Sequence, residues 1–359
     1  MSFEFTPDEQ ARVEIAEFLG VHLDPIGYVD LSTIIVLGTM YAVEFIALCY
    51  QLYNRDYPPL KAKNVPVMFS LYFGGVAWFC GDVFTSGLVH LRHNSVLQSC
   101  RFTAVCLRVC AGAFYVSSGF ALRCYSLYHV FYKGKAYRGK TALLTFGLPI
   151  LTIVIFGVIS LLVPETMTLR YEEIMDLCYF NKGYVCIVLS VIWIIWAYTA
   201  YMSWKMRKIP FCFNEKIEIT TSYVILFIVV IMNTVCILVI PVYAASLGWR
   251  TALLYTNHVG ASVGYWIIMF ECTYNCIFHR EDYLQYWINI LKEDHMEREY
   301  EYSSHLNNNT TLVGMSTFSE LPYKTNSHYQ TSHRHDTASS NVGTTDSLRD
   351  GGSQISISL

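Results

Sequence analysis

Long apolar stretches are the feature of this sequence that most constrains its fold. A helix needs about 20 mostly apolar residues to cross roughly 30 Å of hydrocarbon, and seven stretches meet that requirement. They are Tyr28–Leu52, Val65–His90, Cys100–Phe131, Thr141–Val163, Tyr184–Trp204, Ile219–Ser246 and Ala252–Phe278. Polar connectors separate these stretches, so each helix can satisfy its own backbone hydrogen bonds where water is absent. The pattern predicts an all-α membrane protein built as a seven-transmembrane helix bundle over residues 28–278.

The composition excludes most soluble classes. The 359 residues are 53% hydrophobic and only 15% charged, whereas soluble domains are about 25% charged. A soluble enzyme of this length would need charged faces that the middle of this chain lacks. The formal net charge is −3 and no long basic block is present, which argues against nucleic acid as a partner.

Lysine and arginine are concentrated in alternate connectors. The basic residues are Arg55, Lys61 and Lys63 after the first stretch, Lys133, Lys135, Arg138 and Lys140 after the third, and Lys205, Arg207, Lys208 and Lys216 after the fifth. Cytoplasmic loops carry an excess of these residues. The pattern predicts a multi-pass plasma-membrane protein with residues 1–27 as a short extracellular N-terminus. This segment is acidic and lacks the apolar core of a signal peptide; Thr6 and Pro7 instead predict a helix start.

The residues after the seventh stretch predict two further segments. In 279–296, Leu284, Trp287, Ile288 and Leu291 recur at helical spacing, as in an amphipathic helix that lies in the membrane interface on its inner side. Residues 297–359 are rich in Ser, Thr and Asn and poor in aliphatic side chains, which predicts a disordered cytoplasmic tail. Cys276, just before the interfacial helix, is either a lipidation site or a buried residue.

Two of the twelve cysteines are expected on the extracellular side. Cys100 begins the third stretch, and Cys178 lies in the connector between the fourth and the fifth. The extracellular side is oxidising, so a Cys100–Cys178 disulfide is the expected arrangement, with two free thiols as the alternative. Such a bond would hold the second outer loop over the mouth of the bundle.

This set of features resembles a G-protein-coupled receptor. Rhodopsin-like signatures are missing: the third stretch ends in Leu122-Arg123-Cys124-Tyr125-Ser126-Leu127, and the seventh has no Asn-Pro-x-x-Tyr. That ending is similar to the Leu-Arg-x-Tyr-x-Leu of the fungal seven-helix receptors often called class-C-like. The connector from Asn54 to Asn64, with two prolines and three basic residues, is similar to their first inner loop. Some members of that group carry a regulator of G-protein signalling domain, and the polar tail of this chain is too poor in apolar residues to form one.

Ionisable residues inside the predicted spans are candidates for function, because an unpaired charge in a membrane is costly. Asp82 and Arg108 each lie eight residues below the outer end of their stretch, at a depth of roughly 12 Å, which predicts an ion pair. The pair is either a static clamp or the polar floor of a ligand cavity. Asn257, His258 and Tyr243 are candidate ligand contacts at a similar level, although a tyrosine at a span end is also a common interfacial anchor.

At the inner ends of the spans, we expect an Arg123–Glu271 pair to lock the resting state. Breaking it would let the sixth span swing about Pro241, since proline kinks a helix; the alternative is that Arg123 reaches lipid phosphates. Six residues of the basic loops are candidates for docking an acidic G-protein surface. They are Lys133, Lys135, Arg138, Lys140, Arg207 and Lys208.

The function expected from these features is that of a receptor, not of an enzyme. An extracellular small molecule or peptide would bind the outer half, and a heterotrimeric G protein would bind the inner loops. No cofactor or metal is expected: the seventh stretch lacks the lysine that retinal needs, and His90, His129 and His258 are scattered. The alternative function is a seven-span transporter or a membrane scaffold.

Overall fold

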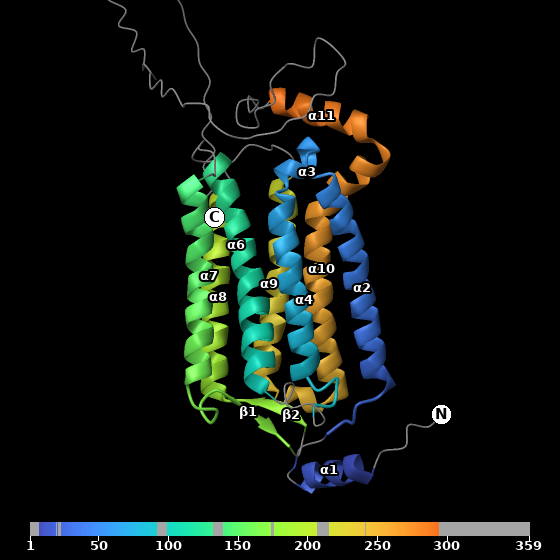
Figure 1. The fold of residues 1–359 in the computed structure, drawn as a ribbon, viewed down its shortest axis with the longest axis vertical. Helices are drawn as coiled ribbons and strands as arrows, with labels where there is room; N and C mark the ends of the chain where they lie inside the picture. Colours follow the sequence, from blue (N-terminus) through green and yellow to red (C-terminus); the bar gives the residue numbers. More distant parts are fainter. Residues whose placement is uncertain are drawn as a thin grey trace, which may run out of the picture. The chain divides into compact units, whose positions relative to one another are not determined.

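The computed structural model describes residues 7–18, 20, 23–91, 99–131, 139–173, 176–206, 215–240 and 242–293. All of them belong to one compact unit, 1–303, in which long helices run side by side (Figure 1). These are α2 (Tyr28–Tyr53), α4 (Val65–Thr85), the continuous η1–α6 (Arg101–Phe114 and Tyr115–Phe131), α7 (Gly139–Leu162), α8 (Lys182–Met206), α9 (Glu215–Val239) and α10 (Leu247–Phe278). Within the described residues, all of these except α10 are long and apolar enough to cross a membrane, six spans in total.

The helix α10 has the length of a span but a more polar composition. It carries Arg250, Asn257 and His258, all buried at 1% exposure or less, as well as Glu271. It packs against α2 and α9 in the interior of the bundle, so these polar side chains meet protein partners. The seventh span therefore stays a prediction, and its polar residues are the reason that hydropathy alone does not identify it.

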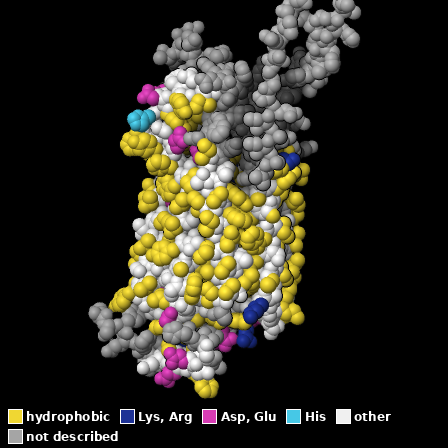
Figure 2. All heavy atoms as spheres, turned by 180° about the vertical axis from the view of Figure 1, so that it is seen from behind, with side chains coloured by type: hydrophobic (Ala, Val, Ile, Leu, Met, Phe, Trp, Pro, Cys, Tyr) yellow, Lys and Arg dark blue, Asp and Glu magenta, His cyan; other side chains and the backbone are white. Residues whose placement is uncertain are grey.

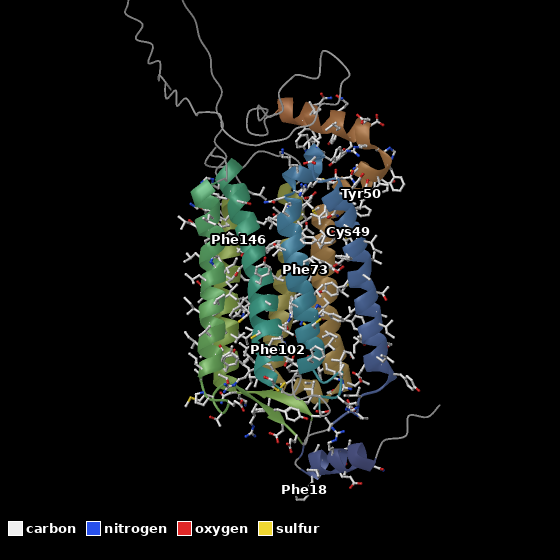
Figure 3. The ribbon with its side chains drawn as sticks, viewed as in Figure 1. Phe18, Cys49, Tyr50, Phe73, Phe102 and Phe146 are labelled. Atoms are coloured by element: carbon white, nitrogen blue, oxygen red, sulfur yellow. A yellow bond between two sulfur atoms is a disulfide. The ribbon has the colours of Figure 1, made fainter. Side chains whose placement is uncertain are left out.

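The surface of the bundle is mostly apolar. Hydrophobic side chains cover the middle of the face in Figure 2, and the charged groups visible there lie toward its ends. Phe73, Phe102 and Phe146, labelled in Figure 3, are 48%, 48% and 37% exposed. A continuous apolar surface of this extent is typical of contact with lipid or another protein. Together with the six apolar helices, it indicates a multi-pass membrane protein.

Short elements distinguish the two ends of the bundle. One end carries α1 (Pro7–Phe18), the antiparallel strands β1 (Leu169–Glu172) and β2 (Leu177–Phe180), and η2 (Tyr243–Ala245). We call it the hairpin end. The other end carries α3 (Pro58–Ala62) and α11 (Arg280–Glu293), which lies across it (Figure 1). We call it the α11 end.

Local sequence explains where several helices begin. The helices α1 and α3 begin at Pro7 and Pro58, since the fixed φ of proline suits the first helical turn and its missing N–H is not needed there. The α1 start agrees with the prediction, and α11 lies within the predicted amphipathic segment. Before α4, Asn64 adopts φ +56°, a left-handed conformation that asparagine tolerates better than most residues.

Two span ends differ from the prediction. The helix α9 ends at Val239, so the expected hinge at Pro241 is wrong: the helix stops before the proline instead of continuing through it, as the restricted backbone before proline favours. The helix α4 ends at Thr85 and not at His90. Gly87, with φ +72°, provides the left-handed residue that commonly follows a helix end.

The third span is not a uniform α-helix. Its first half, η1, has the wider π winding over 14 residues. This winding is rare in proteins, and where it occurs it is often at a functional site. Here η1 crosses α4 at very short range: a Cβ added to Gly81 would lie 2.5 Å from the Arg108 backbone nitrogen. The absence of a side chain at Gly81 therefore permits the crossing that places Asp82 beside Arg108.

Candidate functional site

The predicted contact between Asp82 and Arg108 is present. Arg108 Nε lies 2.6 Å from Asp82 Oδ1, and the two side chains are 9% and 1% exposed. Arg108 Nη1 also donates to Thr85 Oγ1 at 3.0 Å. These residues come from two neighbouring helices, α4 and η1. A buried ion pair needs such additional hydrogen bonds because its desolvation is costly.

The two predicted polar residues of α10 complete the group around Asp82. Asn257 Nδ2 donates to Asp82 Oδ2 at 3.0 Å, and His258 Nε2 lies 3.3 Å from the same oxygen. On its other side, His258 Nδ1 shares a hydrogen bond of 3.0 Å with the Tyr41 hydroxyl. We call Asp82, Arg108, Asn257 and His258 the buried charge cluster; it joins α4, η1 and α10.

Tyr243 contributes its ring to this site. The Arg108 guanidinium carbon lies 6.0 Å from the centre of the Tyr243 ring and 5.6 Å from that of Phe180. Cations are attracted to aromatic faces at such distances. Tyr243 is half-buried, so the structure places it at the site and not only at the edge of a span. All five residues predicted to bind a ligand therefore lie together near the hairpin end.

A cavity of about 510 Å³ lies next to the buried charge cluster. Arg108, Thr85 and Tyr243 line it, with aliphatic side chains of η1, α8 and α9. Small-molecule sites commonly have such volumes, with mostly apolar walls and a few polar groups. The arrangement favours the ligand-cavity interpretation of the Asp82–Arg108 pair, since a wholly enclosed clamp would not line an open space.

The hairpin of β1 and β2 covers this cavity. The expected disulfide joins Cys100, at the start of the third span, to Cys178 in β2, with Cα atoms 5.6 Å apart. Cys178 and Phe180 themselves line the cavity. The bond thus attaches the lid directly to the helix that carries Arg108.

Asp176 anchors the lid on its other side. Its carboxylate accepts hydrogen bonds from the Tyr171 hydroxyl at 2.6 Å and the Leu91 backbone N–H at 3.3 Å, and it lies 3.8 Å from Arg12 of α1. His90 Nδ1 is 3.4 Å away. Burial, together with the Asp176 carboxylate, raises the pKa of the Tyr171 hydroxyl above its usual value near 10, so this hydroxyl remains a donor at any physiological pH.

The expected lock at the α11 end is wrong in its partners. Both residues are described, and they contact different groups: Arg123 Nη1 donates to the Lys63 carbonyl oxygen at 2.8 Å, while Glu271 accepts from the Tyr283 hydroxyl at 3.3 Å. Lys63 in turn forms an ion pair with Glu218 of α9. We call Lys63, Arg123 and Glu218 the α11-end network. Arg123 is 7% exposed, so it packs inside the bundle and does not extend to lipid phosphates.

Several predicted residues lie outside the described part of the chain. They are Lys133, Lys135, Arg138, Arg207, Lys208 and Pro241, together with 294–359, the predicted tail. Lys140 lies in α7, but its side chain is not described.

Cys276 is buried, with the Tyr50 hydroxyl 3.7 Å from its sulfur, so the structure agrees with the buried alternative. The described residues contain no group of three or more His, Cys, Asp or Glu that could hold a metal ion.

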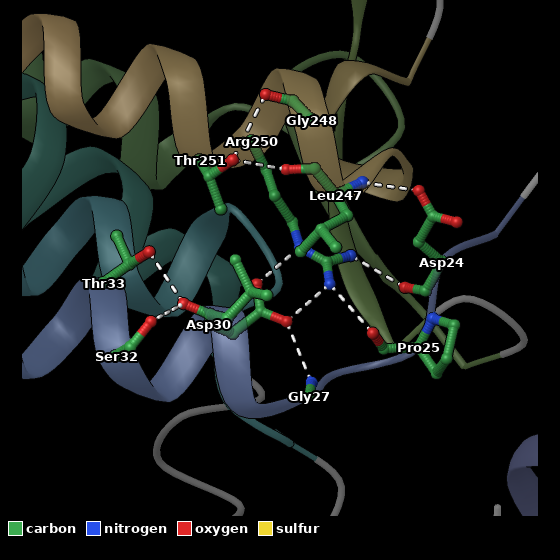
Figure 4. Close-up of polar contacts among 11 residues, drawn as sticks. Asp24, Pro25, Gly27, Asp30, Ser32, Thr33, Leu247, Gly248, Arg250 and Thr251 are labelled. Carbon is green, nitrogen blue, oxygen red and sulfur yellow. Dashed lines mark hydrogen bonds and ion pairs between the residues drawn. The ribbon is translucent and has the colours of Figure 1, made fainter. Parts of the chain in front are cut away.

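Sequence reasoning missed a second buried ion pair at the hairpin end (Figure 4). Arg250 Nε and Nη2 donate to the two carboxylate oxygens of Asp30 at 2.8 and 2.7 Å, and its remaining donors reach the carbonyls of Asp24 and Pro25. The pair joins the start of α2 to the start of α10. The sequence does not identify Arg250 as part of a site, because a single charge at a span boundary gives no signal that it is buried.

Glu218 was missed for a related reason. It stands at the beginning of the sixth span, between two isoleucines, and in the sequence Lys63 indicates only the orientation of the chain. The available signal was the position of Glu218 itself: an acidic residue at the start of a span, directly after a basic loop, indicates a partner of opposite charge. Comparison with known protein families and with curated proteins gave no match to this chain.

Proposed function

We propose that this chain is a seven-span plasma-membrane receptor that binds a small molecule in the cavity and signals to a heterotrimeric G protein. The observation that carries the proposal is the buried charge cluster, which presents Arg108 to a covered cavity of about 510 Å³. Ionisable groups are retained inside membrane spans mainly where they bind or conduct something. A volume of this size accepts a small molecule better than a peptide.

The geometry of α10 supports a seventh crossing. Its 32 residues extend over roughly 48 Å at 1.5 Å per residue, which exceeds the roughly 30 Å of hydrocarbon. Its polar residues, Asn257 and His258, contact Asp82 in the interior. A helix that buries its polar groups in the bundle can present apolar ones to lipid.

The distribution of basic residues supports an exterior hairpin end. All three basic connectors follow helices that end at the α11 end, namely α2, α6 and α8. By the positive-inside rule that end faces the cytosol, and the Cys100–Cys178 disulfide then lies on the oxidising side. Epitope tagging tests this orientation: a C-terminal tag that is accessible on intact cells would contradict it.

The α11-end network supplies a candidate switch for signalling. Arg123 and Arg108 lie on the same continuous η1–α6 helix, so a ligand that displaces Arg108 also acts on the helix that holds Lys63. The Lys63–Glu218 ion pair fixes the start of α9 against the loop that precedes α4. A ligand that binds the displaced arrangement more tightly would shift the population toward it.

The proposal is tested by recovery of a G protein with the full-length receptor. The unsubstituted chain should co-purify with a heterotrimeric G protein after nucleotide removal, and alanine at Lys133, Lys135, Arg138 and Lys140 should reduce recovery at least tenfold while surface delivery is unchanged. Arg170→Ala, at an exposed position of the hairpin end, is the matched control. Failure to recover a G protein with the unsubstituted chain, or recovery unaffected by the four alanines, would refute the proposal.

A further inference from the structure

The walls of the cavity are mostly aliphatic. Among the residues that line it are Val188, Leu189 and Ile192 of α8, Val229 and Ile237 of α9, and Val109 of η1. Such walls gain free energy by covering apolar ligand surface, at about 25 cal/mol per Å². A ligand that fills this space must therefore be largely a hydrocarbon.

Apart from Lys182, which is exposed, the polar groups in the cavity are few and most already have partners. Ser117 accepts from Trp196 Nε1 at 3.2 Å, and Asn233 donates to Asn257. Arg108 is the buried group with donors to spare, because a guanidinium has five N–H groups and its side-chain partners are Asp82, Thr85 and Tyr243. The ligand should accordingly carry one oxygen that accepts a hydrogen bond from Arg108.

The charge balance at Arg108 selects an uncharged ligand. Asp82 already neutralises the guanidinium at 2.6 Å. The other charged lining residues are Glu172, which pairs with Arg170, and the exposed Lys182. A carboxylate ligand would introduce a second anion beside Asp82 at a buried site, where like charges repel strongly. A hydroxyl, carbonyl or ester oxygen accepts from Arg108 without that repulsion.

The lining of the cavity includes exposed residues of both α8 and α9. Leu238 and Val239 of α9 line it and are 54% and 69% exposed; Cys186 of α8 also lines it and is exposed. Deeper in the bundle the two helices are joined by the Trp193–Thr234 hydrogen bond of 3.1 Å. The space on the hairpin side of that contact is thus bordered by residues that are exposed on the surface of the bundle, where a membrane protein meets lipid.

We propose that the cavity binds a neutral single-chain amphiphile, which reaches it from the bilayer between α8 and α9 and places its oxygen against Arg108. The inference rests on the proposed receptor function for its signalling consequence, since it names the class of ligand. The β1–β2 hairpin closes the cavity at that end of the bundle, with Cys178 and Phe180 among the lining residues. An apolar chain that enters between α8 and α9 therefore reaches the cavity without crossing water.

Photolabelling of the full-length protein in phosphatidylcholine nanodiscs tests the proposal. The probe is dodecanol with a diazirine in its chain, and the labelled peptides are identified by mass spectrometry. We expect labelling concentrated on cavity residues of α8 and α9, and competition by dodecanol at least tenfold stronger than by dodecane or dodecanoate. Equal labelling of all lipid-facing helices, or equal competition by the three compounds, would overturn the proposal.

A cavity-filling variant provides the second measurement. Leu189 is 7% exposed and lines the cavity, so Leu189→Trp should reduce labelling at least tenfold; Ile192→Trp serves the same purpose if the first variant unfolds. Leu148→Trp on α7, 67% exposed and outside the cavity lining, is the matched control and should leave labelling unchanged. Labelling that survives in the two folded cavity variants would overturn the site.

The lateral path has its own readout. Val239→Trp should slow the time course of labelling at least threefold when the probe is supplied from lipid vesicles, and an unchanged time course would refute that path. The binding assays contain no G protein, so they are independent of the test of receptor function. Labelling without G-protein recovery would refute the receptor function alone, whereas G-protein recovery without labelling would refute only the ligand class.

Discussion

Replacement of Arg250 by methionine should destabilise the protein more than any substitution of an exposed charge. Methionine keeps most of the length of the side chain but removes its four hydrogen bonds to Asp30, Asp24 and Pro25. Asp30, at 0% exposure, then keeps its hydrogen bond from the Gly27 backbone N–H but loses its counter-charge. Breaking a buried pair on one side costs about 3–5 kcal/mol.

Thermal unfolding of the purified protein in detergent measures this cost. For a chain of this size about 1 kcal/mol corresponds to a shift of roughly 2 °C, so Arg250→Met should lower Tm by about 6–10 °C. Arg170→Met is the matched control: its ion pair with Glu172 is 59% and 25% exposed, and exposed pairs contribute about 0–1 kcal/mol.

A double-mutant cycle decides whether the two residues act as a pair. Asp30→Asn alone leaves Arg250 without a counter-charge and should also be strongly destabilising. Combined with Arg250→Met, it should cost at least about 2 kcal/mol less than the sum of the single changes, because contacting residues couple by up to about 3 kcal/mol. Additive losses of stability, or a decrease in Tm of less than about 2 °C for Arg250→Met, would refute this account of the Asp30–Arg250 pair.

Three further changes test other parts of the structure. Cys178→Ser should lower stability by about 2–5 kcal/mol and abolish the effect of reductant on Tm. Gly81→Ala should be strongly destabilising, since its Cβ would meet the Arg108 backbone. The control is Gly38→Ala, whose Cβ would have no atom within 4 Å; it should be neutral or stabilising by up to about 1 kcal/mol. The same melting assay compares the two variants. Glu218→Gln should raise basal nucleotide exchange at least threefold, because it removes the ion pair of the proposed switch, and exchange at the unsubstituted rate would contradict that role.

The positions of the spans could be predicted because hydropathy is a local property of the sequence. Six of the predicted stretches correspond to helices that meet the length and apolarity of a span. Their ends were less predictable, since these depend on a few backbone-restricting residues. The end of α9 at Val239 and that of α4 at Thr85 both precede such residues, whereas the predictions extended to the last apolar side chain.

Part of the candidate site could also be predicted, because the constant rise of a helix converts sequence position into depth. Asp82 and Arg108 were expected at one level, and they form an ion pair. The partners of Arg123 could not be predicted in this way. Its acceptor is the backbone carbonyl of Lys63, in the connector after α3, which packs against α10 and α11. No pattern in the sequence specifies such packing.

The buried charge cluster and the α11-end network each contain an arginine of the same continuous helix, η1–α6. Arg108 and Arg123 are 15 residues apart on η1–α6, which places them on the order of 20 Å apart along the axis. The segment between them includes the boundary at Phe114, where the π winding changes to regular α. A change from i→i+5 to i→i+4 hydrogen bonds in η1 would rotate Arg108 relative to Arg123. An occupant of the cavity that favours one winding would therefore act on the Lys63 contact through the helix backbone, without a separate chain of side chains between the two ends.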